Sequence, residues 1–223
     1  MGTLYVVGLP IGNPEDVTLR ALRVLRNADI VASKDPRHTR TFLRRHRVQA
    51  LLTTYDRRNA RDKSLILLDR LRCGSTVALV SDCGTPGLYD AGSLLVAYAH
   101  QAGIPVKSVP GPSALAASLA IAGMPGDTVF FQGGFPASKA RATRLLVDLK
   151  ATRCTSIFFV PPERLRRTLT LMEQCLGSRR QVVIAVNLTQ PTERVLRGQI
   201  AAVLRIDPLA FPRDAVTLIV AGK

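Results

Sequence analysis

The chain has 223 residues, of which 31 are Lys or Arg and 16 are Asp or Glu, and 47% of its residues are hydrophobic. This length allows one large domain or two modest ones. No apolar run reaches the roughly 18 residues that a membrane helix needs, and the first residues lack the basic region and cleavage site of a signal peptide. The composition argues against membrane and secreted proteins, so we expect a cytoplasmic protein that contacts no membrane.

The net charge of +15 is unevenly distributed along the chain. Residues 20–72 contain 15 basic and 5 acidic residues, so this stretch alone carries 15 − 5 = +10. A field of this sign attracts polyanions, meaning RNA phosphates or a polycarboxylate. A solvated, Arg-rich surface with no partner is the alternative, and the charge pattern by itself leaves both open.

The four cysteines predict neither a disulfide framework nor a metal site, because they form no C-x-x-C pair and no histidine stands at zinc-like spacing from any of them. We expect reduced and mostly buried thiols.

Taken in chain order, apolar runs alternate with amphipathic patterns over the first half, which is typical of an α/β fold. The near-continuous apolar run at 3–9 suits a buried parallel strand. Further strands are predicted at 29–33, 49–55, 76–82 and 105–111. Helices are predicted within 13–29, with Asp16 or Thr18 as N-cap, and at 38–47, 62–74 and 93–103.

The densest cluster of helix and strand breakers, "PGPS", stands at 110–113 and predicts a boundary between an N-terminal α/β domain, 1–112, and a C-terminal α/β domain, 113–223. The alternation then restarts. Helices are predicted at 113–123, 138–150 and 162–177, and strands at 128–134, 155–160, 181–188, 193–199 and 215–222. Because three strands close the chain in succession, we expect a mixed second sheet beside a mostly parallel first one.

Three breaker-rich turns follow predicted strands: "GLPIGN" at 8–13, "SDCGTPG" at 81–87 and "PGPSA" at 110–114. Ligands of open α/β sheets bind at the carboxyl ends of strands, and glycine lets backbone approach a ligand closely. The turns therefore predict a ligand cradle, with three ordinary strand-to-helix turns as the alternative. Asp82 and Asp90 are expected to orient turns rather than to act in catalysis. Both the dinucleotide fingerprint and the phosphate loop are absent, so backbone and small side chains must bind the ligand.

The stretches "LYVVGLPIGNPEDVTLRALRVLRNADIVASKDPRHTR", "VALVSDCGTPGLYDAGS" and "GIPVKSVPGPSALAASLAIAGMP" resemble the tetrapyrrole methylase superfamily. Within it they are most similar to the bacterial small-subunit ribosomal RNA cytidine 2′-O-ribose methyltransferases. The resemblance implies two α/β domains with S-adenosylmethionine in the cleft between them, a homodimer, and ribosomal RNA or the small ribosomal subunit as partner.

The resemblance also implies site residues, with no metal among their ligands. Cofactor contacts in the first half would be Leu9, Pro10, Gly84, Thr85, Pro86, Leu88, Ser113 and Ala114, and Val160, Leu188 and Val216 are weaker candidates in the second half. Asp35, Arg37 and His38 match a polar catalytic motif. Asp35 or His38 would accept the proton of a ribose hydroxyl, and Arg37 would hold a phosphate. His38 could instead be an ordinary surface residue at a helix start.

Several positions depart from the family pattern, among them Lys34, Pro36, Arg57 and Asn187. Pro36 is expected to stiffen a loop. Because of these departures two other functions stay open: methylation of a small anionic tetrapyrrole or corrin-type substrate, and RNA binding without catalysis.

Overall fold

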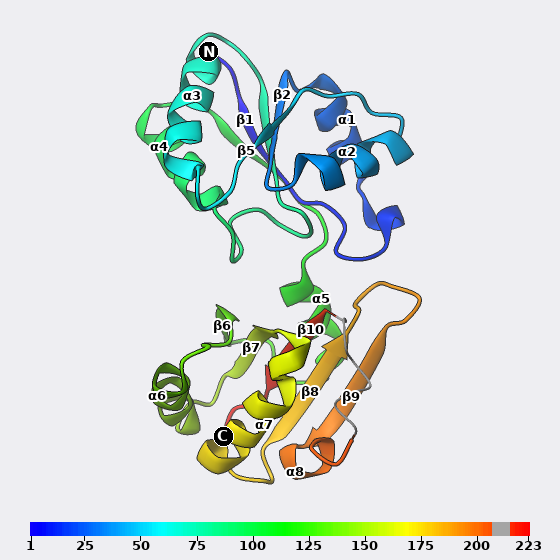
Figure 1. Ribbon diagram of the computed structural model, residues 1–223, viewed down its shortest axis with the longest axis vertical. Coiled ribbons are helices and arrows are strands. Elements are labelled where there is room, and N and C mark those ends of the chain that lie inside the picture. The colour runs from blue at the N-terminus through cyan, green and yellow to red at the C-terminus, as the bar shows by residue number, and fades with distance from the viewer. Residues whose placement is uncertain (207–214) are drawn as a thin grey trace. The chain divides into compact units, whose positions relative to one another are not determined.

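The computed structural model describes residues 1–206 and 215–223, which form two compact units, 1–113 and 114–223 (Figure 1). The first unit contains β1 (Leu4–Val7), a 3-10 turn (Pro14–Asp16), α1 (Leu19–Asn27), β2 (Ile30–Ser33), α2 (Pro36–Arg45), β3 (Leu52–Thr54), α3 (Ala60–Arg72), β4 (Val77–Val80), α4 (Gly92–Gln101) and β5 (Val106–Val109). The second contains α5 (Ala114–Ala122), β6 (Val129–Gly134), α6 (Lys139–Lys150), β7 (Thr155–Val160), α7 (Pro162–Leu176), β8 (Gln181–Val186), β9 (Arg194–Gln199), α8 (Ile200–Val203) and β10 (Val216–Val220).

The first sheet has the order β3-β2-β4-β1-β5, and all of its strand pairs are parallel, as predicted. Apolar side chains of α3 and α4 pack on one face and those of α1 and α2 on the other (Figure 1). Since both faces are covered, all four residues of β4 are buried. The turns after β1, β2, β3, β4 and β5 consequently share one edge of this sheet.

Local capping sets where two of the helices begin. The Thr18 hydroxyl accepts a hydrogen bond from the Ala21 amide and caps α1, which agrees with one of the two predicted caps. Helix α2 begins at Pro36 rather than at the predicted residue 38, because Asp35 is its N-cap and proline fits the first helical position. The expectation that Pro36 stiffens a loop was therefore wrong, since Pro36 starts a helix.

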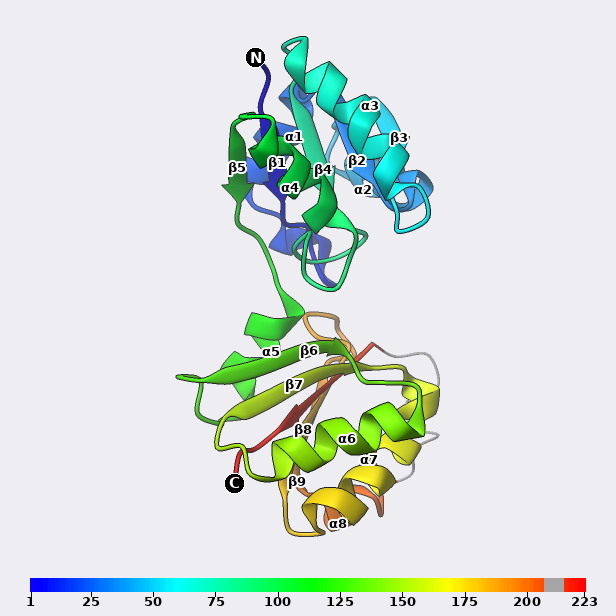
Figure 2. The same cartoon turned by 90° about the vertical axis from the view of Figure 1, so that its left-hand side faces the viewer.

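The second sheet has the order β6-β7-β10-β8-β9 and is mixed, as predicted. Strands β6 and β7 are parallel, and the remaining pairs are antiparallel. Apolar side chains of α6, α7 and α8 pack with the sheet in one core, whereas α5 packs against β10 and β8 (Figure 2). The α/β fold class predicted from the sequence is confirmed in both units.

Three further features bear on function. Across residues 1–206 and 215–223, no helix is long and apolar enough to cross a bilayer. The same residues contain no cluster of three or more His, Cys, Asp or Glu that could hold a metal ion. All four thiols are free, but Cys73 and Cys83 are exposed and Cys154 and Cys175 half-buried. The expectation of mostly buried cysteines was wrong, because Cys73 ends α3 and Cys83 lies in the turn after β4.

Candidate functional site

The turns that follow β1, β4 and β5 meet at one edge of the first sheet. The Leu9 amide donates to the Gly84 carbonyl at 2.9 Å, and the Gly84 amide donates back to the Leu9 carbonyl at 3.0 Å. The first and third turns approach closely where Gly8 lies against Gly111, because a Cβ atom on Gly111 would lie 2.6 Å from the Gly8 carbonyl oxygen. Only residues without side chains allow this approach.

A hydrogen bond from a side chain joins the second turn to the third. The Thr85 hydroxyl donates to the Pro112 carbonyl oxygen at 3.3 Å. At the start of the second turn, the Ser81 hydroxyl lies within hydrogen-bond distance of the Cys83 and Gly84 carbonyl oxygens. Together these bonds fix the shape of the second turn against its neighbours.

Asp90 organises the remainder of residues 81–92. Its Oδ1 accepts hydrogen bonds from the Gly87 amide at 2.6 Å and the Gly92 amide at 2.8 Å. Tyr89 has a φ of 63° and Gly87 a φ of 90°, so the chain passes twice through the left-handed region within three residues. The carboxylate holds this tight path, which agrees with the orienting role predicted for Asp90.

The predicted cofactor residues of the first half occupy this set of turns. Leu9, Gly84 and Pro86 are buried, Pro10, Thr85 and Ser113 are half-buried, and Leu88 is 40% exposed. Ser113 ends the first unit, and Ala114 begins α5 in the second. The structure thus brings the turns of the first unit together, and their role in cofactor binding stays a prediction.

The polar motif begins where β2 ends. Asp35 Oδ1 accepts hydrogen bonds from the backbone amides of Arg37 at 2.8 Å and His38 at 3.2 Å, so Asp35 is the N-cap of α2. The hydrogen bond from the His38 amide, followed by that from Arg37, lowers the pKa of Asp35. A lowered pKa makes this carboxylate a weaker proton acceptor than an ordinary aspartate.

Asp82 ties the polar motif to the turn after β4. Its Oδ1 accepts a hydrogen bond from the Asp35 amide at 3.1 Å, and its Oδ2 lies 3.1 Å from the Lys34 ammonium group. Lys34 thus has a defined partner in the neighbouring turn. The link places the motif beside the cradle turns.

Tyr55 is a supporting residue whose role the sequence analysis did not identify. Its side chain is 3% exposed, and its hydroxyl lies 3.0 Å from the Ser64 hydroxyl, accepts from the Leu95 amide at 3.1 Å and donates to the Ala91 carbonyl. Burial raises the pKa of Tyr55, which keeps the hydroxyl protonated as a donor. The only hint of this role in the sequence was that an aromatic residue ends the strand predicted at 49–55.

Arg57 contacts the turn that follows β4 through Tyr89. Its guanidinium donates to the Tyr89 carbonyl at 3.0 Å and lies 5.1 Å from the centre of the Tyr89 ring. Arg57, one of the departures from the family pattern, therefore links the loop after β3 to the turn after β4.

In the second unit, the three predicted cofactor residues lie together at one edge of the mixed sheet. Val216 pairs with Val160 of β7 and with Val186 of β8, and Leu188 follows β8 by two residues. Val160, Leu188 and Val216 are 3%, 7% and 5% exposed. The chain turns after β8 through Asn187, at a φ of 51°, whose side-chain oxygen accepts from the Ala215 amide at 3.0 Å.

Comparison with known proteins matches residues 3–204 to the family model described as Tetrapyrrole (Corrin/Porphyrin) Methylases. The chain belongs to the tetrapyrrole methylase family. The resemblance seen in the three motifs is confirmed, and the family model extends it over most of both units.

Several curated relatives are similar over the whole chain. "Ribosomal RNA small subunit methyltransferase I" of Thermotoga maritima is 38% identical over 223 residues, covering 100% of both chains. The protein of the same name from Micromonospora olivasterospora is 41% identical over 225 residues, covering 100% of this chain and 71% of its own. Among solved structures, uroporphyrin-III C-methyltransferase from Thermus thermophilus in complex with S-adenosylhomocysteine has a TM-score of 0.65 at 21% identity, covering 99% of this chain and 97% of its own.

Proposed function

We propose that this chain is an S-adenosylmethionine-dependent methyltransferase that modifies the ribose 2′-hydroxyl of a cytidine in small-subunit ribosomal RNA. The observation that carries the proposal is the full-length similarity to a relative named for ribosomal RNA methylation, at 38% identity with 100% of both chains covered. The charge of residues 20–72 supports an RNA substrate, because every basic residue of this stretch except Lys63 is exposed.

The turns of the first unit suit an adenosine-containing cofactor that lacks phosphate. Gly8 and Gly111 leave no room for a Cβ between them, and Gly84 has a φ of 76°, so backbone rather than side chains lines these turns. Backbone amides and carbonyls recognise a neutral nucleoside by hydrogen bonds without a phosphate clamp. Leu9, Pro10, Gly84, Thr85, Pro86, Leu88, Ser113 and Ala114 would hold the cofactor, with Val160, Leu188 and Val216 contributing from the second unit.

The chain's own residues then align and deprotonate the ribose hydroxyl. When bound, S-adenosylmethionine supplies a methyl group activated by its positively charged sulfur. We assign proton acceptance to His38, because imidazole is the commonest proton acceptor near neutral pH and Asp35 is held as a cap with a lowered pKa. Arg37, at the first turn of α2, would hold a phosphate of the substrate through its planar guanidinium.

The two alternative functions have less support. Solved structures named for porphyrin and corrin methylation share the fold at only about 20% identity, whereas relatives named for ribosomal RNA methylation reach 41%. The hypothesis of RNA binding without catalysis rested on the departures at Lys34 and Pro36. Lys34 pairs with Asp82 and Pro36 starts α2, so neither departure disorders the motif.

Tritium transfer from labelled S-adenosylmethionine to small ribosomal subunits that lack the modification tests the proposal. We expect incorporation into RNA, and nuclease digestion followed by mass spectrometry should identify 2′-O-methylcytidine. The Thr85→Trp variant is the control, because an indole at this half-buried position fills the space beside Pro112. Incorporation no higher than in this variant contradicts the proposal, and transfer to porphyrinogens in its place would select the tetrapyrrole function.

We further propose a cytoplasmic homodimer, in keeping with the family resemblance and with a ribosomal substrate. Sedimentation equilibrium of the purified chain measures the mass. A monomer under the conditions of full activity contradicts this part of the proposal.

A further inference from the structure

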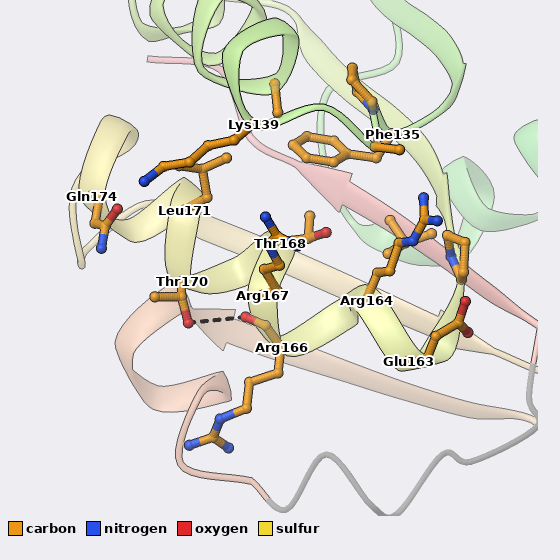
Figure 3. Close-up of a pocket in the computed structure, with 15 residues that line it drawn as sticks. Phe135, Lys139, Glu163, Arg164, Arg166, Arg167, Thr168, Thr170, Leu171 and Gln174 are labelled. Atoms are coloured by element: carbon orange, nitrogen blue, oxygen red, sulfur yellow. Dashed lines mark hydrogen bonds between the residues drawn. The ribbon is translucent and has the colours of Figure 1, made fainter.

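The second unit contains a cavity of about 620 Å³ between α6 and α7, and the proposed methyl transfer does not use it. Its walls are the turn after β6, the end of β7 and one side of α7 (Figure 3). The volume lies within the roughly 300–1,000 Å³ of ordinary ligand sites. Among the described residues that line it, Val160 is the only one also assigned to the cofactor.

One face of α7 supplies much of the lining. Arg164, Arg167, Leu171 and Gln174 follow one another at intervals of three or four residues, so they share a side of the helix. In Figure 3 the side chain of Arg164 points toward the part of the lining that contains Phe135. The side chain of Lys139, from α6, extends toward Leu171. Arg164, Arg167 and Lys139 line the cavity and are exposed, so their charged groups are solvated.

Apolar groups line the interior of the same cavity. Phe135 is 9% exposed and packs edge-on against Phe158, with ring centres 5.4 Å apart. Leu171 and Ala142 add aliphatic surface from α7 and α6. A cavity lined partly by apolar groups and partly by cations fits a ligand that is aromatic at one end and anionic at the other.

The helix ends reinforce the preference for an anion. Strands β6 and β7 are parallel neighbours, and each leads directly into a helix, so α6 and α7 both begin at the same edge of the sheet. The amino-terminal ends of helices of 12 and 15 residues carry partial positive charge. Glu163 contributes a carboxylate to the lining and offers an acceptor for an amino group of a base.

We propose that this cavity, here called the α6–α7 site, binds a nucleotide of the substrate RNA away from the nucleotide that is methylated. The base packs against Phe135 and Leu171, while Arg164, Arg167 and Lys139 hold the flanking phosphates. This inference rests on the proposed function, because it assumes an RNA substrate. An RNA strand suits the site better than a free small anion, since Lys139 comes from α6 and the two arginines from α7 rather than from one point of the lining.

Fluorescence anisotropy with a labelled single-stranded RNA of about 12 nucleotides tests the site on the full chain. The Arg164→Ala/Arg167→Ala double variant should bind about 10-fold more weakly near 100 mM salt. Its plot of log affinity against log salt should be less steep by about 1.4, roughly 0.7 for each phosphate that an arginine no longer neutralises. The matched control is Arg144→Ala, because Arg144 is an exposed arginine of α6 that does not line the cavity. We expect less than about a 2-fold change for this control.

Two further measurements on the same variants separate this inference from the proposed function. Calorimetric titration with S-adenosylmethionine should give unchanged affinity, and tritium transfer to ribosomal subunits should show a raised KM at nearly constant kcat. Equal RNA losses in the double variant and the control overturn the α6–α7 site, as does a fall in cofactor affinity. If the wild-type chain methylates ribosomal subunits and the double variant binds RNA as tightly as the wild type, the α6–α7 site is refuted and the proposed function stands. A wild-type chain with neither RNA binding nor transfer refutes both.

Discussion

The edges of the two sheets that carry predicted cofactor residues are built by different means. In the first unit, backbone meets backbone: Leu9 pairs with Gly84, and Gly8 touches Gly111. In the second unit, the edge carries the buried apolar side chains of Val160, Val216 and Leu188, of which Val160 and Val216 pair directly. The first edge depends on the absence of side chains and the second on their volume.

This difference predicts different responses to mutation. A contact between backbones leaves no freedom to adjust when a methyl group is added, so substitutions in the first edge should impair function as well as stability. An apolar edge can relax partially around a missing methyl group, so substitutions in the second should first reduce stability. Four substitutions test this difference between the two edges.

Gly111→Ala should have the largest effect. Its new Cβ atom would lie 2.6 Å from the Gly8 carbonyl oxygen, so the first and third turns must separate. We expect a loss of up to about 3 kcal/mol in unfolding free energy and about 100-fold in methyl transfer rate, measured by urea unfolding and tritium incorporation. The control is Gly126→Ala, whose Cβ meets Leu119 at an ordinary 3.4 Å. A Gly111→Ala variant as active as this control contradicts the backbone contact.

Val216→Ala should have the second-largest effect. Removing two methyl groups from a side chain that is 5% exposed should cost about 2 kcal/mol of unfolding free energy. Because the surrounding valines can close part of the space, we expect cofactor affinity to fall only about 3-fold. Urea unfolding and calorimetric titration measure the two quantities, with exposed Val147→Ala as control. A loss of affinity of about 100-fold, as large as the rate loss expected for Gly111→Ala, would erase the distinction between the edges.

Asp90→Ala should have a smaller effect on the first edge. It removes the carboxylate that accepts hydrogen bonds from the Gly87 and Gly92 amides. The 81–92 turn therefore loses two hydrogen bonds but gains no steric clash. We expect cofactor affinity to fall about 10-fold, equivalent to about 1.4 kcal/mol, in calorimetric titration. Asp148→Ala on the exposed side of α6 provides the comparison. Unchanged affinity would show that backbone pairing alone holds the turn.

Asp35→Asn should have the smallest effect, visible only in the pH dependence of stability. The pKa of Asp35 is lowered in the folded chain, so its ionised form stabilises the fold above the ordinary aspartate pKa near 4. This contribution is lost as the pH falls through the folded pKa. Melting temperatures from about pH 7 to 3 should decrease less steeply in the variant than in the wild type. A variant whose melting temperatures follow those of the wild type over this pH range refutes the capping contribution.

Particular elements show which parts of the fold the sequence could predict. The 3–9 run and the breakers that bound each apolar stretch predicted the strands, because buried parallel strands need continuous apolar residues. The start of α2 was missed by two residues, since a cap acts through Asp35, outside the periodic pattern. The cysteines were misjudged because exposure depends on position within the fold, and Cys83 lies in a turn.

The fold class could be predicted from the amino-acid sequence, because it follows from short-range patterns of apolar and turn-forming residues, and the family from the resemblance of three motifs in a fixed order. Which groups meet became known from the folded structure alone. The Asp82 contact with Lys34, the Tyr55 contacts with two helices and the cavity between α6 and α7 join residues distant in sequence. Such pairs leave no local signal, because their free energy arises only when strands and helices have packed.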